Sequence, residues 1–247
     1  MEQYTGLAEI YDMTIDADYD KWMEFVKKYM ESRGIDIKGK RLLELGCGTG
    51  NMTTRLREAG LDVTAIDISH EMLSVAEEKA RSKRMRINFL NQDMAHFCLN
   101  RDFDIAASFC DGYNYIIEED ELLGSFKRVY DHLSRGGYFI FDISTSYKLR
   151  NLIGNNTFTM NEEDLCYIWD NYVDDDIIEM YITFFIKEGK LYRRMEEHHI
   201  QKIYEVEHII GALKASGFKR VEVYDDYSFK PVYDKTARAT FIASKED

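Results

Sequence analysis

A glycine-rich segment that follows a short apolar run is the part of this 247-residue chain best suited to binding chemistry. It reads Glu44-Leu-Gly-Cys-Gly-Thr-Gly50, and its glycines leave a backbone that a ligand can approach without meeting side chains. A dinucleotide fingerprint would need its third glycine at position 51, where this chain has Asn51. A phosphate-binding P-loop would end in Gly-Lys-Ser or Gly-Lys-Thr, and this segment does not.

Glu44 stands two residues before the first glycine, at the end of the predicted strand. A carboxylate at that place would repel a pyrophosphate and attract an ammonium group. The pattern therefore favours a ligand with a positive charge, and a dehydrogenase is the least favoured interpretation.

Strand and helix patterns alternate around this segment. Apolar runs predict strands over 41–45, 61–66, 87–90, 103–109 and 138–143. Helical spacing predicts helices over 18–33, 51–59, 69–82 and 118–133. Such alternation predicts an α/β fold with a doubly wound, mostly parallel sheet and helices on both faces.

The rhythm changes after residue 150. Segments 165–172, 177–187 and 191–203 are rich in β-branched and aromatic residues, and turn sequences separate them. We expect a three-stranded antiparallel meander inserted over 151–204. A helix over 206–216 and strands over 220–224 and 239–243 then complete a seven-stranded sheet, so one domain comprises 1–150 plus 205–247.

In order along the chain, the motifs resemble those of class I S-adenosylmethionine-dependent methyltransferases, whose first motif is E/D-x-G-x-G-x-G. The resemblance implies that Glu44 lies near the ammonium group of the cofactor, with Gly46, Gly48 and Gly50 beneath it. Asp67, at the end of the second strand, would hold both ribose hydroxyls, since a carboxylate accepts two hydrogen bonds. Asp93 would meet the adenine amino group. The other expected contacts with S-adenosylmethionine, or with its product S-adenosylhomocysteine, are Tyr19, Trp22, Cys47, Asn51, Ile68, Met72, Gln92, Met94 and Cys110.

The segment after the fourth predicted strand indicates which group of methyltransferases the chain resembles. Nucleobase amino-methylating enzymes often carry N/D-P-P-Y at this place, and this chain instead has Asp111-x-x-Asn114-Tyr115. That pattern, with the later run Tyr192-Arg-Arg-Met-Glu-Glu-His-His199, looks like a bacterial, YqeM-like group. The resemblance implies fold and cofactor but no substrate.

Methyl transfer from a sulfonium mainly needs an aligned nucleophile and a dry site. Tyr4, Tyr11, Tyr19 and Trp22 are candidates for an N-terminal lid, with packing on the sheet as the alternative, and Tyr11 is also a candidate catalytic residue. On the third inserted strand, alternation predicts Arg194, Glu196 and His198 on one face. We expect that face to close the substrate pocket, with His198 as a candidate base and Arg194, Glu196, Asn114 and Tyr115 as substrate contacts. Solvated polar residues of a sheet face are the alternative.

Composition limits the partners. The net charge of −13 opposes nucleic-acid binding, and the basic cluster at 81–86 is interpreted as a solvated helix end. Four cysteines without a CxxC pair argue against a zinc site and disulfides and fit a reducing cytoplasm. No signal peptide or membrane span is evident. We expect a small-molecule acceptor methylated at nitrogen or oxygen. An RNA or protein methyltransferase and a non-catalytic, cofactor-binding regulatory protein are the alternatives, and the oligomeric state stays open.

Overall fold

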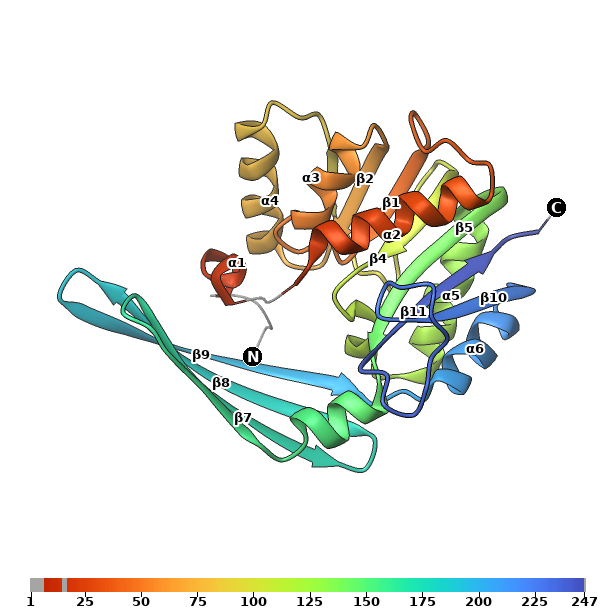
Figure 1. Ribbon diagram of the computed structural model, residues 1–247. Coiled ribbons are helices and arrows are strands. Elements are labelled where there is room, and N and C mark those ends of the chain that lie inside the picture. Colours follow the sequence, from red (N-terminus) through yellow and green to blue (C-terminus); the bar gives the residue numbers. More distant parts are fainter. Residues whose placement is uncertain (1–6, 15–16, 247) are drawn as a thin grey trace.

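A central sheet of seven strands forms the body of the protein, in a computed structural model that describes residues 7–14 and 17–246 (Figure 1). The strand order is β10-β11-β5-β4-β1-β2-β3, and β11 runs antiparallel to the other six strands. The strands are β1 (Arg41–Leu45), β2 (Asp62–Asp67), β3 (Asn88–Asn91), β4 (Phe103–Ser108), β5 (Leu133–Ser144), β10 (Arg220–Asp225) and β11 (Arg238–Ser244). The predicted doubly wound, mostly parallel fold is confirmed. The order reverses beside β1, which pairs with β2 on one side and β4 on the other, and such a switch point is where open α/β sheets bind ligands.

Helices cover both faces of this sheet, and each face has its own apolar core (Figure 1). On one face lie α2 (Tyr19–Ser32), α3 (Asn51–Glu58) and α4 (His70–Ser82). On the other lie α5 (Glu119–His132) and α6 (Val206–Ala215). In α2 the helical spacing of Trp22, Phe25, Val26 and Tyr29 buries one side, and Asp18 begins the helix by accepting a hydrogen bond from the Lys21 amide.

A second sheet leaves the body as a long arm (Figure 1). It is antiparallel and contains β6 (Thr157–Asn161), β7 (Leu165–Asp174), β8 (Ile177–Glu188) and β9 (Leu191–Lys202) in that order. The sequence predicted three of these strands and missed β6. That strand has only five residues and carries polar side chains at alternate positions, so its apolar signal is weak. A π-helical segment, η3 (Lys148–Ile153), joins the arm to β5.

The N-terminal part of the chain connects the arm to the body. Its 3₁₀ turn η1 (Leu7–Glu9) and short helix α1 (Tyr11–Thr14) precede α2. Leu7 and Ile10 pack with Leu165 and Phe184 of the arm in one apolar cluster. This segment therefore lies over the space between the two sheets. Tyr4 lies outside the described residues.

No helix in residues 7–14 and 17–246 is long and apolar enough to cross a membrane.

Candidate active site

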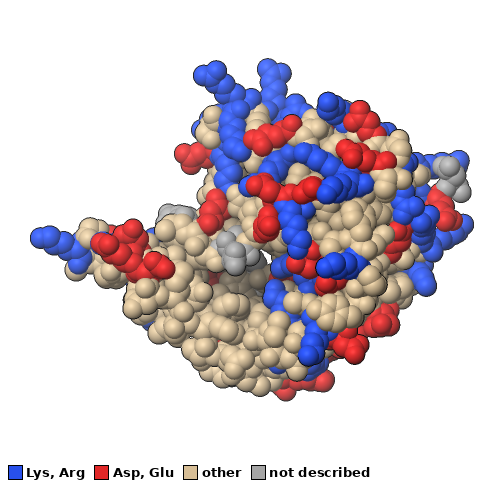
Figure 2. All heavy atoms as spheres, viewed as in Figure 1, with Lys and Arg blue, Asp and Glu red and all other residues tan. Residues whose placement is uncertain are grey.

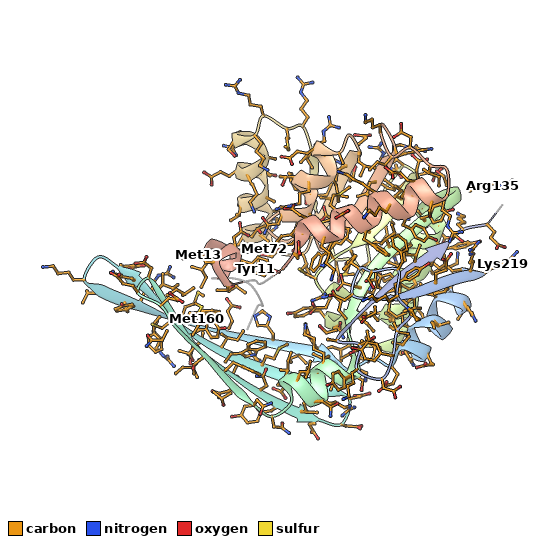
Figure 3. All side chains as sticks on the ribbon, in the orientation of Figure 1. Tyr11, Met13, Met72, Arg135, Met160 and Lys219 are labelled. Carbon is orange, nitrogen blue, oxygen red and sulfur yellow. The ribbon has the colours of Figure 1, made fainter. Side chains whose placement is uncertain are left out.

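A cavity of about 590 Å³ lies at the carboxyl ends of the parallel strands, beside the switch point. One end is formed by the residues that follow β2 and β3, and the other by those that follow β4 together with Tyr11. Tyr11 and Met72, both labelled in Figure 3, line this cavity. The lining comprises Tyr11, Gly46, Gly48, Asp67, Ile68, Ser69, His70, Glu71, Met72, Gln92, Asp93, Met94, Ala95, Phe109, Cys110, Gly112, Tyr115, Ile116 and Glu121.

The glycine loop has a backbone shape that only glycine adopts readily. Gly46, Gly48 and Gly50 all have positive φ angles, of 66°, 53° and 77°. At Gly50 a Cβ atom would also lie 3.0 Å from the Cβ of Ala76 in α4, so the residue allows close packing of the loop on that helix. The loop thus turns sharply at the end of β1 and presents bare backbone to the cavity.

Glu44 is a buried carboxyl group with an unsatisfied oxygen. Its side chain is 2% exposed, and its Oε2 has no hydrogen-bond partner among the residues the structure describes. Burial raises the pKa of Glu44 to about 8, and the neighbouring Asp67 carboxylate adds to the rise. A buried acceptor without a donor is costly, so this position is suited to a ligand that brings a positive charge or an N–H group.

Asp67 ends β2 at the rim of the cavity and is held by two backbone amides. Its Oδ1 accepts from the Ser69 amide at 2.9 Å, and its Oδ2 accepts from the Gly48 amide at 2.7 Å. Burial raises the pKa of Asp67, and these amides act against that rise. Each oxygen keeps a second lone pair, so the fixed carboxylate can still accept hydrogen bonds from a diol.

The turn after β3 is also shaped by its own side chains. Asp93 accepts a hydrogen bond from the Ala95 amide at 2.8 Å, and Gln92 accepts one from the Cys98 amide at 2.9 Å. Both residues line the cavity, at the same end as Asp67.

Comparison with known proteins assigns the family. The family described as "Methyltransferase domain" matches residues 42–137. The chain is 34% identical to "Putative methyltransferase GWCH70_2453" of Geobacillus sp. (strain WCH70), over 98% of this chain and 99% of that protein. It is 33% identical to "Putative methyltransferase YqeM" of Bacillus subtilis (strain 168), over 98% and 97%. A crystal structure of an S-adenosylmethionine-dependent methyltransferase from Clostridium acetobutylicum ATCC 824 superposes with a TM-score of 0.92, at 38% identity and 99% coverage of both chains.

The chain belongs to the S-adenosylmethionine-dependent methyltransferases. The site fits this cofactor, because the unsatisfied Glu44 oxygen suits the ammonium group and the rim carboxylate of Asp67 suits the ribose. Of the predicted cofactor contacts, nine line the cavity: Gly46, Gly48, Asp67, Ile68, Met72, Gln92, Asp93, Met94 and Cys110. Cys47 and Gly50 are buried within the glycine loop.

Trp22 belongs to the core of the methyltransferase and not to the cavity lining. Its ring stacks between Phe109 and Tyr227, with centroid distances of 6.4 and 5.0 Å, and it is 4% exposed. The alternative of packing on the sheet therefore holds for this residue. Helical spacing alone could not separate the two roles, since both need an inward-facing aromatic ring.

The N-terminal segment is fastened to the glycine loop by one cluster of polar side chains. Asp12 accepts from Thr49 at 2.6 Å and from Asn51 at 2.8 Å, and it pairs with Lys79 of α4 at 2.7 Å. Asn51 also donates to the Tyr19 hydroxyl at 3.3 Å. Tyr19 and Asn51 thus hold the segment in place, and Tyr11 beside them lines the cavity.

The inserted strand β9 turns the opposite face toward the site from the one predicted. Alternation is present, but Glu197, His199 and Gln201 are the buried side chains. Gln201 donates to Asp111 at 2.9 Å, which fixes the strand against the loop after β4. The face with Arg194, Glu196 and His198 points outward. Arg194 and Glu196 pair with each other on the surface, and His198 bonds Glu179.

The sequence of the neighbouring strand explains why the buried face of β9 was predicted wrongly. β8 has apolar residues of both parities, so its sequence does not say which side is buried. The buried side carries Ile178, Met180 and Phe184, and these pair across the strands with Gln201, His199 and Met195. Only contact with the body decides between the two faces.

Asn114 is a structural residue. It is fully buried, and its amide donates to the carbonyl oxygens of Ser144 at 3.0 Å and Lys202 at 2.9 Å. Its oxygen accepts from the Ser144 amide at 2.9 Å. With these bonds it joins β5 and the end of β9 to the loop after β4, so the prediction that Asn114 binds substrate does not fit its position. Its neighbour Tyr115 lines the cavity.

A buried charge cluster supports the loop after β4, and sequence analysis missed it. Arg238 bonds Asp111 at 3.0 Å and also bonds Asp142, whose other oxygen accepts from the Tyr227 hydroxyl. Although burial alone would raise the pKa of Asp111, Arg238 and Lys148 lower it. Cys110 and Asp111 both have positive φ angles, of 60° and 49°, and Asp142 accepts both of their amides. The cluster therefore holds a strained turn in place at the cavity wall.

In the described part of the chain, no group of three His, Cys, Asp or Glu residues is arranged to hold a metal ion.

Proposed function

We propose that this methyltransferase transfers the methyl group to a nitrogen or oxygen atom of a small molecule, and that the acceptor lies at the Tyr11–Tyr115 end of the cavity. The carrying observation is that a single cavity extends from Asp67 and Asp93 to Tyr11, Cys110 and Tyr115. Its volume of about 590 Å³ lies within the range of about 300 to 1,000 Å³ usual for small-ligand pockets.

The surroundings of the cavity support a small acceptor. The N-terminal segment lines it through Tyr11, and Asp12 bonds this segment to the glycine loop. The arm lies behind Tyr115 and is bonded to the loop after β4 by Gln201. A macromolecular acceptor would have to pass these elements.

The charge distribution also supports a small acceptor. Lys and Arg are interspersed with Asp and Glu on the face in Figure 2, where the visible part of the arm below the hollow is largely uncharged. The basic cluster at 81–86 lies at the end of α4, whereas Ser69, which begins that helix, lines the cavity. A helix of 13 residues separates them, which is about 20 Å. A nucleic acid whose phosphates bound at the basic cluster would therefore lie at the far end of α4 from the cavity.

The residues act by binding and orientation. S-adenosylmethionine supplies a methyl group bonded to a sulfonium. When this methyl group is transferred, the thioether S-adenosylhomocysteine is the leaving group, and it is a good one. Glu44 and Asp67 would fix the two ends of this donor, and the strained turn at Cys110 and Asp111 would shape the wall beside the acceptor. Burial raises the pKa of Cys110 to about 12 and that of Tyr11 well above its usual value, so both stay protonated at neutral pH. Catalysis then depends chiefly on alignment and the exclusion of water.

Label transfer from S-adenosylmethionine with a radioactive methyl group tests the proposal. The protein is incubated with three separate fractions of a bacterial extract: small molecules, total RNA and total protein. We expect label in the small-molecule fraction and S-adenosylhomocysteine formed in equal amount. Label confined to RNA or protein would contradict the proposal. Binding of S-adenosylhomocysteine without label transfer to any fraction would favour the non-catalytic alternative.

A further inference from the structure

The inner face of β9 places His199 in contact with Tyr115, a residue of the cavity wall. Tyr115 lines the cavity, and its hydroxyl lies 3.4 Å from Nδ1 of His199. The two rings meet edge to face, with centroids 5.9 Å apart and an angle of 74°. The bond from Gln201 to Asp111 sets the position of β9 two residues further along. The arm therefore supports the acceptor end of the cavity indirectly, through the contact of His199 with Tyr115.

The surroundings of His199 determine the direction of this hydrogen bond. Burial, with a contribution from His198, lowers the pKa of His199 to about 4, so the ring is neutral at neutral pH. Its Nε2 lies 3.9 Å from a carboxylate oxygen of Glu197, which favours the tautomer with the proton on Nε2. Nδ1 is then the acceptor, and the Tyr115 hydroxyl donates to it. A phenol oxygen whose proton is engaged in this way can still accept hydrogen bonds.

We propose that Tyr115 contacts the methyl acceptor and accepts a hydrogen bond from its reacting N–H or O–H group, while His199 positions Tyr115. This inference rests on the proposed function and adds residues and a binding mode to it. The bond to Tyr115 directs the lone pair of the acceptor at the methyl carbon. The acceptor's lone pair forms the new bond to the methyl carbon as the carbon–sulfur bond breaks, and the electron pair of the broken bond stays on sulfur. The proton of the methylated group is released to water when the product leaves the site. Tyr115 and His199 form no covalent bond in this step, and their contribution is orientation.

The chain contains a matched control beside His199. His198 has the same ring and lies on the same strand, but on the outer face. There it bonds Glu179 at 2.9 Å and stacks on Tyr181 at 4.3 Å between centroids. A change at this position alters β9 without touching the cavity wall.

The test measures S-adenosylhomocysteine formation with the small-molecule fraction of a bacterial extract, titrated by dilution, for the wild type and variants. For His199→Leu we expect a fall of about 10- to 100-fold in kcat, the size of effect that misplacement by 1 Å can have. His198→Leu should stay within about twofold of the wild type, since its contacts with Glu179 and Tyr181 lie on the outer face of the arm. In all of these variants the affinity for S-adenosylhomocysteine should stay within about twofold, because no cofactor contact changes.

Two further variants separate positioning from mere filling of space. The amide oxygen of His199→Asn ends at the same distance along the side chain as Nδ1, so this variant should recover most of the activity that His199→Leu loses. Tyr115→Phe should lose about as much as His199→Leu, and the double variant should be no slower than Tyr115→Phe, because both changes remove one function.

Three results would each overturn the role assigned to Tyr115 and His199. Equal activity of His199→Leu and His198→Leu, failure of His199→Asn to recover activity, or multiplied losses in the double variant would overturn the inference while leaving the proposed function intact. If the wild type itself converts nothing in the small-molecule fraction, the proposed function fails and the inference fails with it. Thermal unfolding of every variant identifies losses caused by misfolding, and Tyr115→Phe then provides an independent test.

Discussion

Replacing Glu44 with glutamine should make cofactor binding weaker and almost independent of pH. The pKa of about 8 means that roughly nine in ten Glu44 side chains carry a proton at pH 7. An ammonium group bound beside it favours the ionised form, so binding should release about 0.9 proton at pH 7. The dissociation constant of S-adenosylhomocysteine should accordingly fall nearly tenfold for each unit between about pH 6 and pH 7.5.

Glu44→Gln should weaken cofactor binding but increase the stability of the protein without ligand. The pKa of Glu44 in the folded protein lies above the value of 4.5 that it has when exposed, so its contribution to stability is fully present below pH 4.5 and is lost as the pH rises toward 8. The loss approaches about 1.4 kcal/mol per pH unit in that window. Glutamine does not ionise and avoids this loss. Without ligand, Glu44→Gln should therefore gain thermal stability relative to the wild type as the pH rises.

Calorimetric titration with S-adenosylhomocysteine in two buffers of different ionisation enthalpy measures both affinity and proton release. At pH 7 we expect affinity to fall by about 10- to 100-fold in Glu44→Gln, the loss of one charge-assisted hydrogen bond, and proton release to vanish. Glu78→Gln, a change at an exposed glutamate, is the control and should match the wild type. Unchanged affinity in Glu44→Gln, or no proton release by the wild type, would refute the assignment of Glu44 to the ammonium group.

Three further predictions concern the elements that form the site. Asp12→Asn should speed dissociation of S-adenosylhomocysteine by about three- to tenfold in stopped flow, since the charge pair with Lys79 fastens the N-terminal segment, and the exposed Asp20→Asn should not. Although burial alone would raise the pKa of Asp12, Lys79 lowers it, so wild-type dissociation should be flat across neutral pH and speed up only in acid. Asn114→Ala should destabilise the protein by about 2 to 4 kcal/mol in denaturant unfolding, because a buried amide loses three hydrogen bonds, whereas a small change would mean that this junction is solvated. Gly50→Ala should lower the free energy of unfolding by at least about 1 kcal/mol more than Gly34→Ala does. Both glycines have positive φ, but of the two only Gly50 has no room for a Cβ atom. Equal losses would show that the loop does not pack tightly on α4.

Much of the methyltransferase body could be predicted because its signals are local. The apolar strands, the glycine loop and the acid that ends β2 each depend on a few neighbouring residues, and parallel strands bring their carboxyl ends together. The cavity lining accordingly includes most of the predicted cofactor contacts.

The arm and the acceptor end were harder to predict because their arrangement depends on distant contacts. Alternation places His198 and His199 on opposite faces of β9 but does not say which face is buried. Contacts with the body show it, among them the bond from Gln201 to Asp111 across 90 residues. Asn114 has the composition of a binding residue, yet its three bonds to two distant strands engage its whole amide. Arg238 likewise meets Asp111 across 127 residues, a pairing with no signal in either local sequence.

A crystal structure with S-adenosylhomocysteine bound would test the central claim most directly. We predict the ribose on Asp67, the amino group toward Glu44 and the sulfur at the end of the cavity where Tyr11, Cys110 and Tyr115 lie. A sulfur atom that faces away from Tyr115, or a nucleoside bound outside the cavity, would contradict both the assigned orientation and the acceptor site built on it.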